Sequence, residues 1–280
     1  MKLSKEVLPD YFTMAGPANS HYKTITNSFD FIGNGSKTLV VTVGESWTWG
    51  SDITVDNDKE TRLSKVYGRL IAEQLNSDWL NLSLPGAGNF WIANTVGEFI
   101  NISGMLEYDK IYLICTLTEI GRSFDSDYDR YIDYINWFNT TDNYNKLFNF
   151  LNKECIEKIQ QLSANNDRII LRIGSNFVDL AGFDDSMCCL KNTWLDCVLE
   201  KFNIKLASKC YTAMHGLQHL EKSEQFIKDK SKYLEWMTEL IELATERLDI
   251  LSNKNIFRNY HPLESGHRIW ADYILGTFNV

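Results

Sequence analysis

The sequence has little of several features that would by themselves set its class. Only 4 of its 280 residues are proline, and no internal repeat or low-complexity tract is visible. Its 6 cysteines fall at irregular positions, so we expect reduced thiols rather than a disulfide framework. No run of 18 apolar residues is present, which predicts no membrane-spanning helix.

Positively charged residues are fewer than negatively charged ones, and the sequence shows no export signal. Lys and Arg total 28 against 37 Asp and Glu, which gives a net charge of −9 at pH 7. Such a surface would repel phosphates, so we expect neither a nucleic-acid partner nor a membrane partner. The first residues lack the apolar core of a signal peptide, and we therefore expect a cytoplasmic protein.

The usual signatures of nucleotide and metal sites are missing. The glycine turn after the first predicted strand matches neither the Gly-x-Gly-x-x-Gly pattern nor the Walker pattern. His215 and His219 have the spacing of two zinc ligands on one helix face, but no second ligand pair matches them. The acidic segment from Asp125 resembles a calcium loop, yet Arg130 and Asn136 stand where glycine and glutamate are needed. We predict no metal and no cofactor.

The sequence does contain a regular alternation of strand and helix patterns. From residue 38 to 174, β-branched apolar runs alternate with segments whose apolar residues recur at helical spacing. This predicts an α/β protein with a mainly parallel sheet and helices on both of its faces. We expect strands at about 38–43, 79–84, 110–117 and 168–174, and helices at about 60–75, 90–100, 144–163, 192–201, 223–251 and 264–276.

The same pattern predicts one main domain with additions. Residues 1–36 are polar and contain turn signals, so we expect an N-terminal arm or cap. Residues 37–280 are expected to form the α/β domain, with insertions at about 123–143 and 175–252. The first insertion is rich in aromatic residues. The second contains the amphipathic helix expected at 223–251, whose apolar stripe is either core or the contact surface of a homo-oligomer.

The segment after the first predicted strand carries the strongest chemical signal. Residues 39–43 are apolar, and Gly44-Glu45-Ser46 ends the run abruptly. This places a serine hydroxyl at the carboxyl end of a strand, where open α/β sheets bind ligands. Gly86 and Thr118 follow the next two strands and are expected at the same edge. Taken alone, a serine in this position is also typical of a structural turn.

Four short blocks, in order, resemble the SGNH or GDSL hydrolase superfamily. Gly44-Glu45-Ser46 resembles the Gly-Asp-Ser block, and residues 81–86 resemble the block that ends in the oxyanion glycine. Residues 111–122 resemble the third block, and His261-Pro262 resembles the terminal block. Together the blocks span about 39–275, which is nearly the whole chain.

The resemblance implies a fold and a set of roles. The fold is a three-layer α/β/α sandwich of flavodoxin-like type with helical insertions. Ser46 is the nucleophile, and His261 is the base that activates it. The backbone N–H groups of Ser46 and Gly86 form the oxyanion hole together with a side-chain donor, which is Thr118 or Asn89.

Three positions depart from the family pattern. Glu45 replaces the usual aspartate, and Thr118 replaces the usual asparagine donor. Arg258 stands three residues before His261, where the family has the acid of its triad. We consider three further residues for the missing roles: Asn259 to orient the imidazole, Glu119 as a substitute acid, and Arg122 to share in holding the oxyanion.

These residues predict a serine esterase or acetylesterase that acts through an acyl-enzyme. The aromatic insertion, and the likeness of the third block to phage-encoded members, favour a carbohydrate O-acyl ester among small-molecule substrates. The departures at Thr118 and Arg258 favour an alternative, a catalytically impaired protein that keeps the fold as a binding or structural module. Such a module would belong to a virion if the protein is phage-encoded.

Overall fold

The structure is a computed structural model. It describes residues 29–54, 58–118, 141–177, 188–204 and 249–278, together with Leu3 and Leu180. In the helix from Thr141 to Ser163, side chains are described from Asn152 onward. Most of the aromatic insertion and most of the helix expected at 223–251 lie outside these residues.

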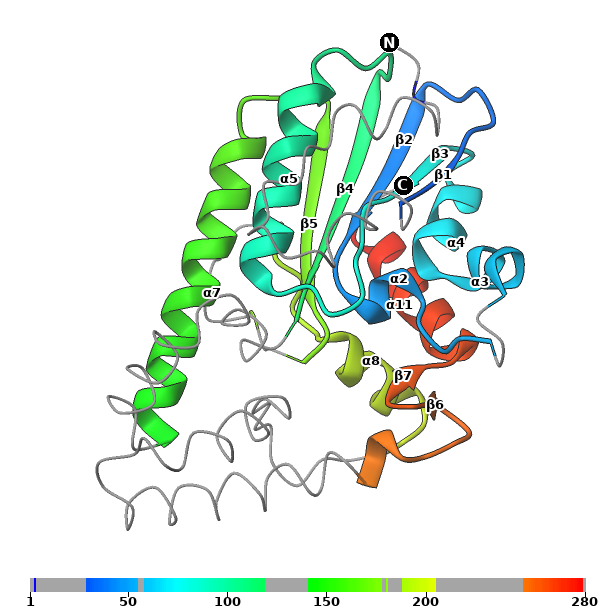
Figure 1. Cartoon of the computed structure of the whole chain (residues 1–280), viewed down its shortest axis with the longest axis vertical. Helices are drawn as coiled ribbons and strands as arrows, with labels where there is room; N and C mark the ends of the chain where they lie inside the picture. The colour runs from blue at the N-terminus through cyan, green and yellow to red at the C-terminus, as the bar shows by residue number, and fades with distance from the viewer. Residues whose placement is uncertain are drawn as a thin grey trace, which may run out of the picture.

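A five-stranded sheet forms the centre of the molecule (Figure 1). Its order is β1 (Asp30–Ile32), β3 (Asp78–Asn81), β2 (Thr38–Val43), β4 (Lys110–Leu117) and β5 (Ile169–Ser175). The last four are parallel, and β1 is antiparallel to β3. Because β2 lies between β3 and β4, the chain winds first to one side of β2 and then to the other. The carboxyl end of β2 is therefore the switch point at which such sheets bind ligands.

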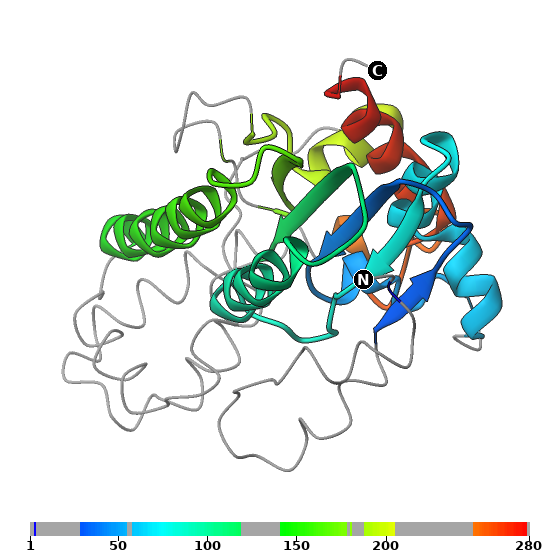
Figure 2. The same cartoon turned by 90° about the horizontal axis from the view of Figure 1, so that it is seen from above.

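Helices cover both faces of the sheet and complete three layers (Figures 1 and 2). One face carries α5 (Asn89–Ser103) and α7 (Thr141–Ser163), and the other carries α4 (Tyr67–Gln74), α8 (Trp194–Lys201) and α11 (Glu264–Gly276). In β2, Leu39, Val41 and Val43 belong to the first core and Val40 to the second, as the period of two requires. The predicted three-layer α/β/α fold is confirmed.

The helix expected at about 60–75 is two helices. α3 (Lys59–Lys65) ends and α4 begins at Val66, whose backbone is extended with φ −69° and ψ 142°. Val66 and Tyr67 are both fully buried, so the apolar spacing continues through the break and does not reveal it. The break leaves Tyr67 N without a helical partner, and it donates to His267 Nδ1 at 3.2 Å.

Two short strand pairs were not predicted from the sequence. The arm expected for residues 1–36 supplies β1, which pairs with β3 through Asp30 and Asn81. Near the carboxyl end, β6 (Phe257–Arg258) and β7 (His261–Pro262) form a two-stranded antiparallel hairpin. Strands of two or three residues are too short to show a period of two.

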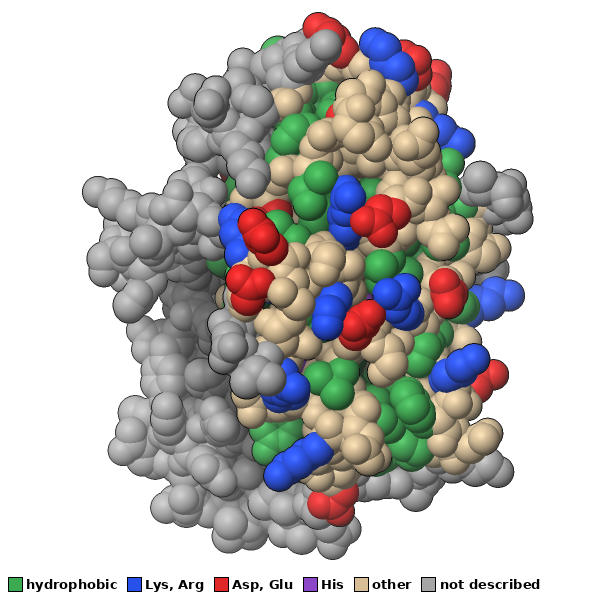
Figure 3. All heavy atoms as spheres, turned by 90° about the vertical axis from the view of Figure 1, so that its right-hand side faces the viewer, with side chains coloured by type: hydrophobic (Ala, Val, Ile, Leu, Met, Phe, Trp, Pro, Cys, Tyr) green, Lys and Arg blue, Asp and Glu red, His purple; other side chains and the backbone are tan. Residues whose placement is uncertain are grey.

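The face that carries α3 and α4 has acidic and basic side chains close together (Figure 3). Arg69 lies 2.9 Å from Glu73, and Lys65 lies 3.1 Å from Glu264. Exposed pairs of this kind contribute little stability, but they prevent a field of one sign on this face. In the part of the chain that the structure describes, no helix is long and apolar enough to cross a membrane.

Candidate active site

Ser46 is the first residue of a one-turn helix, α2 (Ser46–Trp49), directly beyond the carboxyl end of β2. Glu45 caps this turn, because its carboxylate accepts a hydrogen bond from Trp47 N at 2.9 Å. The N–H of a first helical residue has no partner inside its own helix. The turn therefore presents a hydroxyl and a backbone donor at the same point.

Two glycines make this tight turn possible. A Cβ on Gly44 would lie 2.2 Å from Thr48 Oγ1, and one on Gly50 would lie 2.2 Å from Val66 Cγ1. Gly50 also has a φ of 88° and closes α2 by donating to Ser46 O at 3.0 Å. Glycine alone combines this close approach with a left-handed backbone.

His261 is carried by the β6–β7 hairpin, which packs on Trp47. Arg258 pairs with His261, and the two residues between them, Asn259 and Tyr260, have φ of 47° and 66°. Positive φ at both loop positions is typical of a type I′ hairpin turn. Trp47 Nε1 donates to Tyr260 O at 3.1 Å. The ring of Trp47 also packs against Phe177, Trp194 and Phe257, with centroid distances of 4.6, 5.4 and 5.9 Å.

Three polar side chains meet where this hairpin reaches α2. Ser46 Oγ lies 2.9 Å from His261 Nε2, and His261 Nδ1 lies 2.9 Å from Asp52 Oδ2. The second contact has the length of an ion pair without the alignment of a hydrogen bond. With Nδ1 facing the carboxylate, Nε2 is the ring nitrogen that faces the Ser46 hydroxyl.

Asp52 is the residue of this group that the sequence analysis missed, since we expected Asn259 or Glu119 in its place. Asn259 forms the exposed tip of the hairpin, and the carboxylate comes from the loop after α2. Asp52 has a φ of 58°, a conformation that aspartate tolerates better than most residues. Arg258, which stands at the family's acid position, places Nη1 3.5 Å from Asp52 O and so contacts the segment that supplies the carboxylate.

A second carboxylate, Glu45, also touches the serine. Glu45 Oε2 accepts a hydrogen bond from Ser46 Oγ, and Glu45 Oε1 accepts one from Asn176 Nδ2. Glu45 is 1% exposed and Asn176 is fully buried, so bulk water does not screen these contacts. Asn176 was not predicted from the sequence, although a polar residue directly after a buried strand, here β5, is the kind of signal that reveals it.

The expected oxyanion residues lie in two loops at the same edge of the sheet. Gly86 has a φ of 83° in a turn that Ala87 N closes on Leu84 O at 3.0 Å, as in a type II turn. Thr118 is fully buried, and its hydroxyl has no hydrogen-bond partner among the described residues.

Asn89 has a supporting position, and its amide is already engaged. Its Nδ2 donates to Thr118 O and to Asn152 Oδ1, both at 2.9 Å, and its Oδ1 accepts from Thr118 N at 2.8 Å. An asparagine amide has two hydrogens, and both are used here. Asn89 therefore holds the Thr118 backbone, and Thr118 is the better candidate for the side-chain donor.

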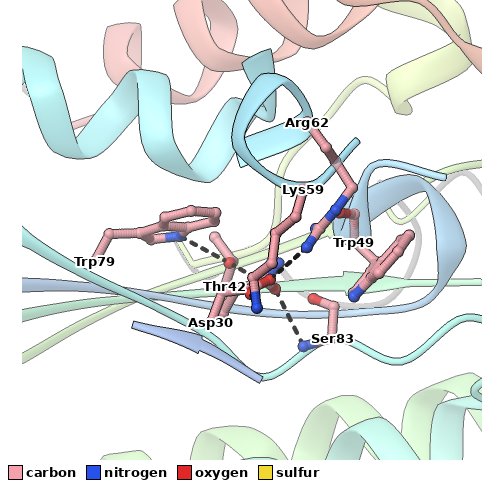
Figure 4. A network of polar contacts seen from close by, with 8 residues as sticks. Asp30, Thr42, Trp49, Lys59, Arg62, Trp79 and Ser83 are labelled. Atoms are coloured by element: carbon pink, nitrogen blue, oxygen red, sulfur yellow. Dashed lines mark hydrogen bonds and ion pairs between the residues drawn. The ribbon is translucent and has the colours of Figure 1, made fainter. Parts of the chain in front are cut away.

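A buried ion pair holds the far end of α2 (Figure 4). Arg62 Nη2 lies 2.8 Å from Asp30 Oδ2, and Arg62 Nη1 donates to Trp49 O at 2.6 Å. Lys59 Nζ lies 3.0 Å from Asp30 Oδ1, on the outer side of the pair. Because Arg62 is 2% exposed and Asp30 is the acid that it contacts, removal of Asp30 would leave the Arg62 charge buried and uncompensated. The edge strand β1 thus supplies an acid that fixes the helix of the nucleophile.

His267, the second histidine of the terminal block, lies in the core behind this site. It is fully buried against Trp194, with ring centroids 4.9 Å apart, and its Nδ1 accepts from Tyr67 N. Burial first, and the nearby His261 to a smaller extent, lower the pKa of His267 to about 3. His267 is therefore neutral at ordinary pH and acts as a packing residue.

Several expected features lie outside the described residues. Among the candidates for the site these are Glu119 and Arg122, and among the candidates for metal binding these are His215 and His219. Within the described ranges, no group of three or more His, Cys, Asp or Glu side chains is arranged to hold a metal ion.

Comparisons with known proteins give only remote likenesses. No family model matches the chain, and no curated protein matches it. Seven chains of solved structures match. One is a member of the lipolytic protein G-D-S-L family from Veillonella parvula DSM 2008, at 14% identity and a TM-score of 0.39, covering 86% of this chain and 98% of that chain. Another is the lipase Lip_vut3 from a goat rumen metagenome, at 12% identity and a TM-score of 0.38, covering 86% of this chain and 97% of that chain. Both TM-scores are below 0.5, so the chemistry of the site rests on the geometry of this chain.

Proposed function

We propose that this chain is a serine ester hydrolase of the SGNH type that acts through an acyl-enzyme on Ser46. The observation that carries the proposal is the succession of Ser46 Oγ, the His261 imidazole and the Asp52 carboxylate, with 2.9 Å between neighbours. Serine-histidine-acid triads occur on unrelated folds and are recognised by geometry and role rather than by sequence order.

The proposed reaction follows from the order of these groups. Ser46 Oγ attacks the acyl carbon while His261 Nε2 takes the hydroxyl proton, and Asp52 stabilises the imidazolium that forms. His261 then gives this proton to the leaving alcohol. In the second half of the reaction, His261 takes a proton from water, which attacks the acyl-enzyme, and Ser46 Oγ leaves with that proton.

The negative oxygen that develops at the acyl carbon needs donors. We assign this role to the N–H groups of Ser46 and Gly86 and to the Thr118 hydroxyl. The support is that Ser46 begins α2 and that the buried Thr118 hydroxyl has no partner in the described part of the chain. One such donor is typically worth about 10²–10³ in rate.

The substrate class that we propose is a carbohydrate O-acyl ester. Its first support is the aromatic composition of residues 123–143, which suits the apolar face of a sugar ring. A net charge of −9 also favours a neutral substrate over a phosphorylated one.

The hydrolase proposal is tested by p-nitrophenyl acetate turnover with wild type, Ser46→Ala and Ser51→Ala. We expect Ser46→Ala to lower kcat/KM by about 10³ or more, because it removes the hydroxyl that lies 2.9 Å from His261 Nε2. Ser51→Ala removes a hydroxyl from the same loop and is expected to change kcat/KM by less than about 3-fold. Equal turnover by wild type and Ser46→Ala would contradict the proposal.

One contact favours the alternative, a catalytically impaired binding or structural module. The Ser46 hydroxyl has a single proton, and Glu45 Oε2 accepts it in the geometry described above. While that bond persists, the proton is not available to His261. A module of this kind would bind ligands at the same edge of the sheet but would form no covalent adduct at Ser46.

A further inference from the structure

Tyr260 is the residue beside the site that the proposed mechanism does not use. Among the described residues, four large apolar side chains are notably exposed, and Tyr260 is the one that adjoins His261. It is 47% exposed, so its ring contributes little to the core. Its carbonyl is held by Trp47 Nε1 at 3.1 Å, and Trp47 directly follows Ser46. The backbone of Tyr260 is therefore fixed relative to both reacting side chains.

The conformation of Tyr260 is unfavourable for its residue type. Its φ of 66° lies in the left-handed region, and the second position of a type I′ turn strongly prefers glycine. Asn259 at the first position, with a φ of 47°, is a residue that this region accepts. An aromatic residue thus occupies a glycine position and gains little packing there. Backbone strain that is not offset by side-chain packing is concentrated at functional positions.

We infer that Tyr260 is a platform for the alcohol part of the substrate, an inference that rests on the proposed function. His261 delivers its proton to the leaving oxygen, so the alcohol part must lie beside His261. The exposed side chain nearest to His261 in sequence is a flat aromatic ring. Such a ring can stack on the C–H face of a sugar. The inference therefore names the residue that would contact the sugar of the proposed carbohydrate ester.

The proposed role of Tyr260 is tested by the ratio of kcat/KM for an O-acetylated methyl glucoside to kcat/KM for ethyl acetate. Loss of one stacked ring is expected to lower this ratio about 5- to 20-fold in Tyr260→Gly, through KM. Tyr260→Phe keeps the ring and is expected to stay within about 2-fold. Because Gly relieves the left-handed backbone, the Tm of Tyr260→Gly should be unchanged or up to about 3 °C higher.

Asn259→Gly is the matched control, because it loosens the same turn and leaves the ring in place. A fall of the ratio in Asn259→Gly equal to that in Tyr260→Gly would assign the effect to the backbone and overturn the inference. An unchanged ratio in Tyr260→Gly would overturn it as well.

A binding measurement separates this inference from the hydrolase proposal. In the Ser46→Ala background, titration with methyl glucoside, followed by NMR, needs no turnover. We expect the Kd for methyl glucoside to rise about 5- to 20-fold in Tyr260→Gly and to stay unchanged in Asn259→Gly. Equal affinity in both variants would contradict the platform. Failure of the hydrolase proposal would instead appear as equal ester turnover by wild type and Ser46→Ala.

Discussion

His261 and His267 lie six positions apart in the terminal block, yet their surroundings are opposite. His261 is on a hairpin with its side chain 21% exposed, and each ring nitrogen lies 2.9 Å from a polar side chain. His267 is fully buried in α11, where Nδ1 accepts a backbone N–H and Nε2 has no partner among the described residues. The first ring is placed to exchange protons with a serine, and the second to stay neutral.

The difference shows that partners and solvent access, rather than residue type, decide what a histidine does. A histidine that carries protons needs a group that exchanges a proton with one ring nitrogen, a carboxylate at the other ring nitrogen, and access for a substrate. His267 serves the fold, because it satisfies the Tyr67 N–H that the break between α3 and α4 leaves without a helical partner. We therefore propose that the two histidines make separate contributions, His261 to activity and His267 to stability.

The largest predicted effect separates these two contributions. His261→Ala is expected to lower kcat/KM on the order of 10⁴ and to change the free energy of unfolding by less than about 1 kcal/mol. His267→Ala is expected to lower the free energy of unfolding by about 2–4 kcal/mol, because it creates a cavity and leaves Tyr67 N unsatisfied. The folded fraction of His267→Ala should keep kcat/KM within a few-fold. Urea unfolding and ester turnover measure the two quantities, and a large activity loss in folded His267→Ala would break the comparison.

A smaller effect follows from the pKa of His267. Burial lowers this pKa to about 3 from an ordinary value of 6.5, so between these values only the unfolded chain binds the proton. The stability contribution is complete above pH 6.5 and is lost as the pH falls toward 3. The slope contributed by one such group reaches about 1.4 kcal/mol per pH unit.

His267→Asn tests this slope, because its Oδ1 can accept from Tyr67 N and its side chain does not titrate. We expect the variant to be less stable at pH 7 and to lose less stability than wild type between pH 6.5 and 4.5. Urea unfolding at several pH values in this window gives both slopes. Identical slopes would show that His267 is not the buried titrating group.

Much of the fold follows from sequence patterns, and its misses have physical causes. The buried strands β2 and β4, of 6 and 8 residues, were predicted at their observed positions, since short and mainly apolar runs bounded by turns leave few alternatives. The break at Val66 was missed because both helices bury the same apolar face there. The N–H group that the break frees is satisfied by His267, 200 residues further along the chain, and local spacing does not reveal such a distant partner.

The candidate site was predicted unevenly for a similar reason. Ser46 and His261 belong to short blocks whose residue types are themselves informative. Asp52 lies in a polar loop with several acidic neighbours, and only the folded hairpin shows which carboxylate faces the imidazole. Asn176 was missed in a segment with little periodicity, where its contact with Glu45 depends on the pairing of β4 with β5 and of β2 with β4.

The most direct test of the triad is the rate at which a fluorophosphonate labels Ser46, followed by mass spectrometry of the labelled peptide. We predict one adduct, at Ser46, in the wild type. Labelling should be slower by about 10² or more in Asp52→Asn, which loses the charge facing His261 Nδ1, and within about 3-fold of wild type in Asn259→Ala. Absence of the adduct in folded wild type, or equal rates for wild type and Asp52→Asn, would contradict the account.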